Sequence, residues 1–296
     1  MGGRMKEVAF IFPGQGRIPS GPPPPSPLVD SLLDLAADLG LPLREWFADR
    51  PEERFSATRA AQPALFIDSI ARDCALRSRG IVPAAVAGHS LGEYVALVSA
   101  GVLSPSDALE IVIERGRLME GIDGGMAAIV GLPPAEVEKL CADAGEAVTV
   151  ANYNGPTQLV VAGPKEELDR VGRSAAEAGG RVIPLRVSGP FHSPAMRPAE
   201  EGLAPLIERT RFSDPKITVV SGVSGKIEGS GGGLKRLMLY QITSSVRWVD
   251  VIRRLEGVGI TRAVEVGSGN VLTRLGRRTT EGIEFLTYEE ACDEGI

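Results

Sequence analysis

The chain has 296 residues and a mass of 31.2 kDa, of which 43% of residues are hydrophobic and 24% are charged. This length excludes a peptide hormone or a small disulfide scaffold and predicts one large domain with a smaller insertion, and the composition is that of a soluble globular chain. The net charge of −6 argues against general binding to nucleic acid or to anionic membranes.

Short β-like runs alternate with longer helical patterns along the first third of the chain. Residues 8–12 read VAFIF, and helical patterns begin at Leu28 and at Gln62. AAVAGHS at 84–90 predicts a further strand, and a helix follows from Leu91. This alternation is typical of an α/β fold.

The stretch from Met126 to Val187 has an order of elements of its own. It predicts a strand, a helix, two strands, a helix and a strand, which is the βαββαβ pattern of ferredoxin-like domains. The earlier α/β pattern resumes afterwards, with strands at 216–222 and 261–267. We therefore predict a large, hydrolase-like α/β domain with a parallel sheet, formed by residues 1–125 and 188–296, and an inserted ferredoxin-like domain at 126–187.

Two stretches rich in turn residues are predicted to be loops. They are the proline run Pro22–Pro25 and the glycine-rich Gly229–Gly233. A proline run can be the ligand of a proline-reading domain, but a stiff surface connection is the simpler interpretation.

The three cysteines Cys74, Cys141 and Cys292 are odd in number and have no CxxC spacing, so we expect structural thiols in a reduced, cytoplasmic protein. No run approaches the roughly 18 apolar residues of a membrane span. Two histidines and scattered cysteines provide no metal-ligand spacing, so no metal is expected. Gly267 and Gly269 match only half of a dinucleotide fingerprint, so no nucleotide is assigned to them.

Residues 88–92 read GHSLG, a GxSxG pattern between a strand-like and a helical stretch. That context is the one a nucleophile elbow requires. The glycines permit a sharp turn that exposes the Ser90 hydroxyl, and the backbone N–H of Leu91 becomes a donor to an oxyanion. The alternative is an ordinary tight turn with an incidental serine.

A serine nucleophile needs a base, and the chain has only His89 and His192. His89 adjoins the serine and is expected to point away from the elbow, so His192 is the candidate base, in a loop directly after the last strand of the insertion. No Asp or Glu stands out as its orienting partner, and the order serine, acid, histidine of α/β-hydrolases fits poorly. A backbone carbonyl is the alternative partner.

Five motifs, in order along the chain, carry a resemblance to a known family. They read FPGQG at 12–16, AQPAL at 61–65, GHSLGEY at 88–94, ERGRLM at 114–119 and GPFHSP at 189–194. With further matches from Ala151, at 246–248 and from Glu265, they extend over nearly the whole length. The chain resembles the malonyl-CoA:acyl carrier protein transacylases, which are related to the acyltransferase domains of polyketide synthases. The resemblance implies a large α/β domain with a ferredoxin-like insert.

The resemblance also implies roles for individual residues. Ser90 becomes the nucleophile and His192 the general base and later acid. The N–H groups of Gln15 and Leu91 form the oxyanion hole. Arg115 binds the malonyl carboxylate, because a planar guanidinium donates two parallel hydrogen bonds to a carboxylate.

Two further roles follow from the same resemblance. A main-chain carbonyl within residues 241–246, that of Ser244, orients the histidine. Phe191 crowds an α-methyl branch and so favours malonyl over methylmalonyl groups.

The implied reaction is ping-pong transfer of malonyl from its coenzyme A thioester to the phosphopantetheine thiol of acyl carrier protein in fatty acid biosynthesis, through a malonyl-serine intermediate. No permanently bound cofactor, nucleic acid or membrane partner is implied, and the family behaviour implies a monomer. Because carrier proteins are acidic, docking would need a local basic patch. The candidates are Lys235 with Arg236, and Arg274 with Arg277 and Arg278, and the alternative is that these are ordinary solvated charges.

The sequence departs from the family pattern after FPGQG, where Arg17-Ile18-Pro19 and the proline run replace a polar segment, and at Gly222, Ser245 and Ser268. The loop after Gly16 borders the substrate entrance in the family, so its departure from the pattern affects the range of thioesters that the protein accepts. Three alternatives stay open: a related transferase, such as a stand-alone polyketide-type acyltransferase or the malonyl-loading subunit of a malonate decarboxylase; a serine thioesterase; and a non-catalytic module that docks carrier protein.

Overall fold

Five parallel strands form the central sheet of this computed structural model, which describes residues 7–15, 17–19, 21–49, 55–145 and 147–294. β1 (Val8–Phe12) lies in the middle, flanked by β2 (Ala85–Gly88) and β8 (Arg262–Glu265). β7 (Thr218–Val220) and β9 (Glu284–Thr287) form the two edges. The prediction of a mixed α/β fold with a parallel sheet is confirmed.

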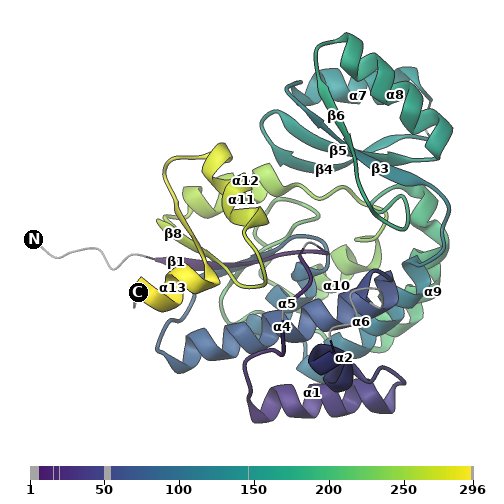
Figure 1. Ribbon diagram of the computed structural model, residues 1–296. Coiled ribbons are helices and arrows are strands. Elements are labelled where there is room, and N and C mark those ends of the chain that lie inside the picture. The colour runs from purple at the N-terminus through teal and green to yellow at the C-terminus, as the bar shows by residue number, and fades with distance from the viewer. Residues whose placement is uncertain (1–6, 16, 20, 50–54, 146, 295–296) are drawn as a thin grey trace, which may run out of the picture.

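Helices cover both faces of this sheet (Figure 1), as parallel sheets require. Phe10 and Phe12 of β1 belong to one apolar core, and the alternate residues Ala9 and Ile11 belong to a second. The first core contains α4 (Thr58–Ser78), α5 (Gly92–Ser99) and α6 (Pro105–Met119), whereas α11 (Trp248–Gly257) and α12 (Val271–Thr279) contribute to the second.

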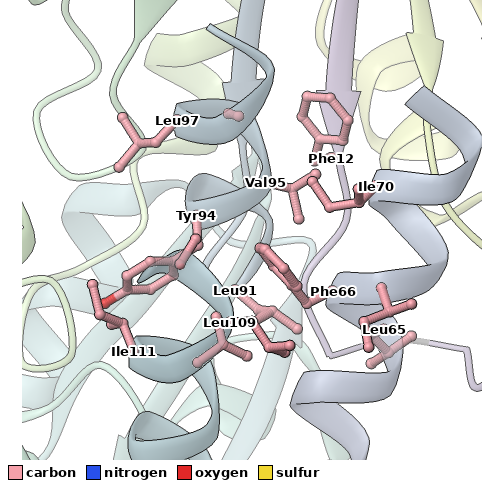
Figure 2. Close-up of a cluster of buried hydrophobic side chains, with 14 of the residues drawn as sticks. Phe12, Leu65, Phe66, Ile70, Leu91, Tyr94, Val95, Leu97, Leu109 and Ile111 are labelled. Carbon is pink, nitrogen blue, oxygen red and sulfur yellow. The ribbon is translucent and has the colours of Figure 1, made fainter. Parts of the chain in front are cut away.

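Figure 2 shows how the first core supports the turn between β2 and α5. Leu91 points toward Phe66 of α4 and Leu109 of α6, and the ring of Tyr94 lies beside Ile111 of α6. All five side chains are at most 1% exposed. The residue after Ser90 is therefore held by apolar packing against two neighbouring helices.

The remaining helices surround this body. They are α1 (Pro27–Asp38), α2 (Leu43–Asp49), the short 3₁₀ turn Pro194–Met196, α9 (Arg197–Arg209), α10 (Gly231–Leu239) and α13 (Tyr288–Glu294). Among the described residues, no helix is long and apolar enough to cross a membrane.

A second, antiparallel sheet lies apart from the first, at the upper right of Figure 1. Its strands are β3 (Gly125–Val130), β4 (Thr149–Gly155), β5 (Gln158–Gly163) and β6 (Arg181–Pro184), in the order β4-β5-β3-β6. Ala127 and Ile129 of β3 pack with α7 (Pro134–Asp143) and α8 (Lys165–Glu177), while Met126 and Ala128 join the first core of the main body. Both faces of this sheet are therefore covered.

The prediction of a loop over Gly229–Gly233 is wrong in its second half, because α10 begins at Gly231. The Ser230 hydroxyl accepts a hydrogen bond from the backbone N–H of Gly233 at 3.1 Å and so caps the helix. A Cβ at position 231 would lie 2.5 Å from the carbonyl oxygen of Phe212. The glycine there permits a close backbone approach at the start of a helix instead of marking a flexible loop.

Candidate active site

Ser90 lies at the carboxyl end of β2, one residue before the N-cap Leu91 of α5. Its φ is 53°, in the left-handed region that a residue with a side chain seldom adopts. Gly88 and Gly92 make this turn possible: a Cβ on Gly88 would overlap the backbone nitrogen of Glu93, and one on Gly92 would overlap the carbonyl oxygen of Phe12. The strained turn raises the serine above the edge of the sheet.

The structure brings His192 to this serine from 102 residues further along the chain. Its Nε2 lies 2.7 Å from Ser90 Oγ, and its Nδ1 lies 2.9 Å from the carbonyl oxygen of Ser244 and 3.1 Å from that of Gln241. Carbonyl oxygens only accept hydrogen bonds, so the proton resides on Nδ1 and the lone pair of Nε2 faces the serine. This is the arrangement of a general base oriented without a carboxylate.

The backbone at His192 is also special. Its φ is 60°, and its N–H donates to the carbonyl of Ile242 at 3.1 Å. The side chain is only 3% exposed, although it follows a loop. The relative position of Ser90 and His192 is thus fixed by an unusual backbone conformation at each of the two residues.

Burial, together with the positive charge of nearby Arg115, lowers the pKa of His192 to about 3. A depressed histidine pKa keeps the imidazole neutral, and so able to accept a proton, throughout the neutral and mildly acidic range.

We therefore expect the rate at which a neutral sulfonyl fluoride modifies Ser90 to stay constant between about pH 8 and about pH 5. The reagent carries no carboxylate, so its own ionisation does not contribute. Modification is followed by intact-protein mass. A rate that instead halves near 6.5, the ordinary pKa of a histidine, would contradict this assignment.

Arg115 approaches the same hydroxyl from α6. Its Nη2 donates to Ser90 Oγ at 3.2 Å and to Gln241 Oε1 at 3.3 Å, and its Nη1 donates to Gln62 Oε1 at 2.7 Å. The guanidinium lies over the ring of Tyr94, 5.8 Å from its centroid, and the residue is 1% exposed. Burial lowers its pKa.

None of these hydrogen-bond partners of Arg115 carries a charge. A buried cation that is solvated only by neutral groups is costly, and an anionic ligand would relieve the cost. The arrangement is therefore suited to a carboxylate placed next to the serine.

A cavity of about 230 Å³ opens in front of the serine, between the carboxyl edge of the parallel sheet and the antiparallel sheet. Gln15 and Phe191 both lie on its wall, and Leu91, next to Ser90 in the chain, is buried. Phe191 itself is 7% exposed. The cavity is lined by Pro13, Gly14, Gln15, His89, Ser90, Met126, Asn152, Asn154, Val160, Leu185, Val187, Phe191, His192, Val271, Leu272 and Leu275.

His89, the other histidine, binds elsewhere. Its Nε2 lies 2.9 Å from Asn154 Oδ1, and its ring packs edge-on against Trp248 at 5.5 Å between centroids. The imidazole hydrogen-bonded to Ser90 is that of His192.

Three polar residues of the site were not predicted from the sequence as site residues: Gln62, Gln241 and Glu93. Gln62 and Gln241 are each 1% exposed and hydrogen-bond to Arg115, while Glu93 is 2% exposed and hydrogen-bonds to Gln241. A glutamine within the apolar helical stretch AQPALF was the available signal for Gln62, because a buried amide needs a polar partner.

In the described part of the chain, no group of three or more His, Cys, Asp or Glu side chains could hold a metal ion. Cys74, Cys141 and Cys292 are free thiols. The chemistry available at the site is that of a serine, a neutral imidazole and a guanidinium.

Comparison with known proteins places these residues in a family context. Residues 33–287 match the acyl transferase domain family. The chain is 37% identical to the malonyl CoA-acyl carrier protein transacylase of Escherichia coli K12, over 97% of each chain.

Two solved structures share the fold closely. An acyl carrier protein S-malonyltransferase from Vibrio cholerae superimposes with a TM-score of 0.88 at 36% identity, covering 95% of this chain and 96% of its own. A malonyl-transacylase solved in complex with a type II polyketide synthase acyl-carrier protein gives a TM-score of 0.87 at 35% identity, over 95% of both chains.

Proposed function

The chain belongs to the acyl transferase domain family, and on that basis we propose that it transfers the malonyl group of malonyl-CoA to the phosphopantetheine thiol of acyl carrier protein. It is an acyl-carrier-protein S-malonyltransferase of fatty acid or polyketide biosynthesis. The observation that carries this function is the buried guanidinium of Arg115, hydrogen-bonded to the hydroxyl of Ser90 at 3.2 Å. This guanidinium can bind a carboxylate directly beside the nucleophile.

In the first half-reaction, Ser90 Oγ attacks the thioester carbonyl while His192 Nε2 accepts the hydroxyl proton. The carbonyl oxygens of Ser244 and Gln241 stabilise the resulting imidazolium through Nδ1–H. The backbone N–H groups of Gln15 and Leu91 stabilise the developing oxyanion. The C–S bond then breaks, the proton passes from Nε2 to the sulfur of coenzyme A, and a malonyl-serine ester is left.

The second half-reaction reverses these roles. His192 takes the proton of the phosphopantetheine thiol, and the thiolate attacks the ester carbonyl of the malonyl-serine. The C–O bond to Ser90 breaks, and the imidazolium returns its proton to Oγ. Coenzyme A is therefore a substrate component in this mechanism, and no bound cofactor takes part.

Arg115 holds the malonyl carboxylate through both halves by two parallel charge-assisted hydrogen bonds. Phe191 lies on the cavity wall one residue before His192, where its ring would crowd a branch on the carbon next to the thioester. We infer a preference for malonyl over methylmalonyl groups.

The arrangement of the two sheets supports a division into a hydrolase-like α/β domain, formed by residues 1–125 and 188–296, and a ferredoxin-like insert at 126–187. The insert strands follow the order β4-β5-β3-β6 with both helices on one face. Residues 1–6, 16, 20, 50–54 and 295–296 of the first unit and 146 of the second lie outside the described residues. The monomeric state and the cytoplasmic location stay predictions.

For carrier-protein docking, the position of α12 favours the arginine cluster over the α10 pair. Leu272 and Leu275 of α12 line the cavity, while Arg274, Arg277 and Arg278 of the same helix are exposed. The Arg278 guanidinium also donates to Gln158 Oε1 of the insert at 3.0 Å. A negatively charged carrier protein bound there would lie beside the cavity through which its thiol must enter.

We expect the double charge reversal Arg277→Glu/Arg278→Glu to raise the KM for carrier protein by about tenfold at low salt and to leave kcat little changed. Steady-state kinetics with malonyl-CoA fixed at saturation measures this. The matched control is Lys235→Glu/Arg236→Glu on α10. An unchanged KM, or an equal rise for both pairs, would remove the α12 cluster as the docking surface.

The experiment that tests the function is intact-protein mass after brief incubation with malonyl-CoA, followed by addition of phosphopantetheinylated carrier protein. A malonyl adduct that passes to the carrier is expected, and methylmalonyl-CoA in the same assay is expected to react more slowly. An adduct lost only to water would indicate a thioesterase, and no adduct with carrier binding retained would indicate a docking module. Equal rates for the two acyl donors would reject the role of Phe191.

A further inference from the structure

Glu93 is a buried carboxylate that the reaction described above does not use. It lies in the first turn of α5, three residues after Ser90, and is 2% exposed. Its Oε1 accepts hydrogen bonds from the Ser221 hydroxyl at 2.7 Å and from the Gly222 backbone N–H at 2.9 Å. Its Oε2 accepts one from Gln241 Nε2 at 3.1 Å. Since burying an ionised carboxylate is costly unless donors surround it, this is a site built around one acceptor group.

Gln241 connects this carboxylate to the active site. Its Nε2 donates both hydrogens, one to Glu93 Oε2 and one to the backbone carbonyl of Ser90 at 2.8 Å. Its Oε1 accepts from Arg115 Nη2 at 3.3 Å. The amide oxygen and both amide hydrogens of Gln241 therefore have hydrogen-bond partners.

Only one orientation of the Gln241 amide satisfies these three neighbours. A flipped amide would turn its oxygen toward the Glu93 carboxylate and the Ser90 carbonyl, two acceptors, and its NH₂ toward the Arg115 guanidinium, a donor. Because an ionised carboxylate only accepts hydrogen bonds, Glu93 acts together with the Ser90 carbonyl to turn the amide oxygen of Gln241 toward Arg115.

We propose that Glu93 is a positioning residue for the malonyl carboxylate: acting through Gln241, it keeps an acceptor against Arg115 and so holds the guanidinium beside Ser90. This inference rests on the proposed malonyl transfer. Glu93 touches neither the substrate nor the reacting atoms. Burial raises the pKa of its carboxyl, and the hydrogen bonds from Ser221, Gln241 and Gly222, together with the charge of Arg115, oppose that rise and favour the ionised form.

The variant that tests this is Glu93→Gln, which keeps the size of the side chain and removes its charge. Ser221 and Gly222 would hold the new amide oxygen, so its NH₂ would face the NH₂ of Gln241. The Gln241 amide would then lose its acceptor at position 93 and be displaced, or would flip and oppose Arg115 with its own NH₂. We expect kcat/KM for malonyl-CoA to fall by about 10- to 100-fold, the effect of losing a hydrogen bond to a charged group. We expect kcat/KM for acetyl-CoA, which has no carboxylate to bind Arg115, to change little.

A double-mutant cycle with Arg115→Ala separates positioning from general destabilisation. If Glu93 acts through the guanidinium, Glu93→Gln causes no further loss of malonyl transfer in the Arg115→Ala background. Gln241→Met is the second variant, because it removes the amide and leaves the bonds of Glu93 to Ser221 and Gly222 in place. It is expected to lower malonyl transfer in the same way and also to have no added effect without Arg115.

Glu265→Gln is the matched control. Glu265 is also a fully buried carboxylate, and it accepts from the backbone N–H and the hydroxyl of Thr273, both at 2.8 Å. None of its described hydrogen bonds reaches Ser90, His192 or Arg115. We expect this control to leave the ratio of malonyl to acetyl kcat/KM unchanged.

The outcomes distinguish the inference from the function on which it rests. Equal losses in the presence and absence of Arg115, or equal losses for malonyl-CoA and acetyl-CoA, would overturn the positioning role of Glu93 while the wild-type protein still transfers malonyl groups. A wild-type protein that forms no malonyl adduct would overturn the proposed function itself.

Discussion

Replacement of Ser90 by alanine is expected to abolish the malonyl adduct and to lower malonyl transfer by about 10⁴-fold or more. The reason is that, within the part of the chain that the structure describes, the hydroxyl is the only atom hydrogen-bonded both to His192 Nε2, at 2.7 Å, and to Arg115 Nη2, at 3.2 Å. Without it, the acyl group has no acceptor in front of the base. Intact-protein mass and a carrier-protein gel assay measure the two effects.

The alanine is expected to leave the fold intact. The φ of 53° at this position lies in the left-handed region, which alanine and serine tolerate about equally. A thermal melt provides the control. Ser99→Ala, at the end of the same helix α5, is the matched substitution outside the site. An adduct of unchanged yield in Ser90→Ala would show that another group is acylated and would reject the assigned nucleophile.

Replacement of Arg115 by alanine is expected to lower kcat/KM for malonyl-CoA by about 10²- to 10⁴-fold, since two charge-assisted hydrogen bonds to the carboxylate are lost. The rate with acetyl-CoA is expected to change much less, so that the preference between the two acyl donors narrows or reverses. Removing the buried cation also removes one of the charges that depress the pKa of His192. Steady-state kinetics with both thioesters measures the change.

Arg115→Lys is the informative companion variant. A lysine keeps the charge but loses the planar fork that matches a carboxylate, so we expect it to recover only part of the malonyl rate. Arg117→Ala, on the exposed side of the same helix and paired with Glu114, is the matched control and is expected to behave as wild type. Equal losses for malonyl-CoA and acetyl-CoA in Arg115→Ala would show a structural role and reject carboxylate recognition.

The parts of the site that are local in sequence could be predicted without the structure. The elbow depends on glycines two residues to either side of Ser90, and the strand and helix that flank it have their own hydrophobic patterns. The assignment of the base needed only a count, because the chain holds two histidines and one of them adjoins the serine. The role of the Leu91 N–H followed from the elbow pattern, whereas the roles of Gln15 and Arg115 came from the family resemblance.

Other features could not be predicted, because they depend on contacts between distant segments. The family resemblance implied one carbonyl as the partner of His192 Nδ1, that of Ser244. The carbonyl of Gln241, which the structure places 3.1 Å from the same nitrogen, was not expected. The start of α10 at Gly231 was missed because the glycine pattern resembles a loop. The Ser230 cap and the close approach of that backbone to Phe212 explain it.

The sequence by itself therefore predicted the candidate nucleophile, the candidate base and the mixed α/β fold class, since each follows from short-range spacing or from residue counts. Only the tertiary structure decided how Arg115 is held. Its partners Gln62 and Gln241 lie 53 and 126 residues away along the chain, and Glu93 reaches Gln241 across 148 residues. Such pairs leave no periodic pattern in the sequence. Each buried polar group needs a hydrogen-bond partner, and that partner can come from any segment that the fold brings close.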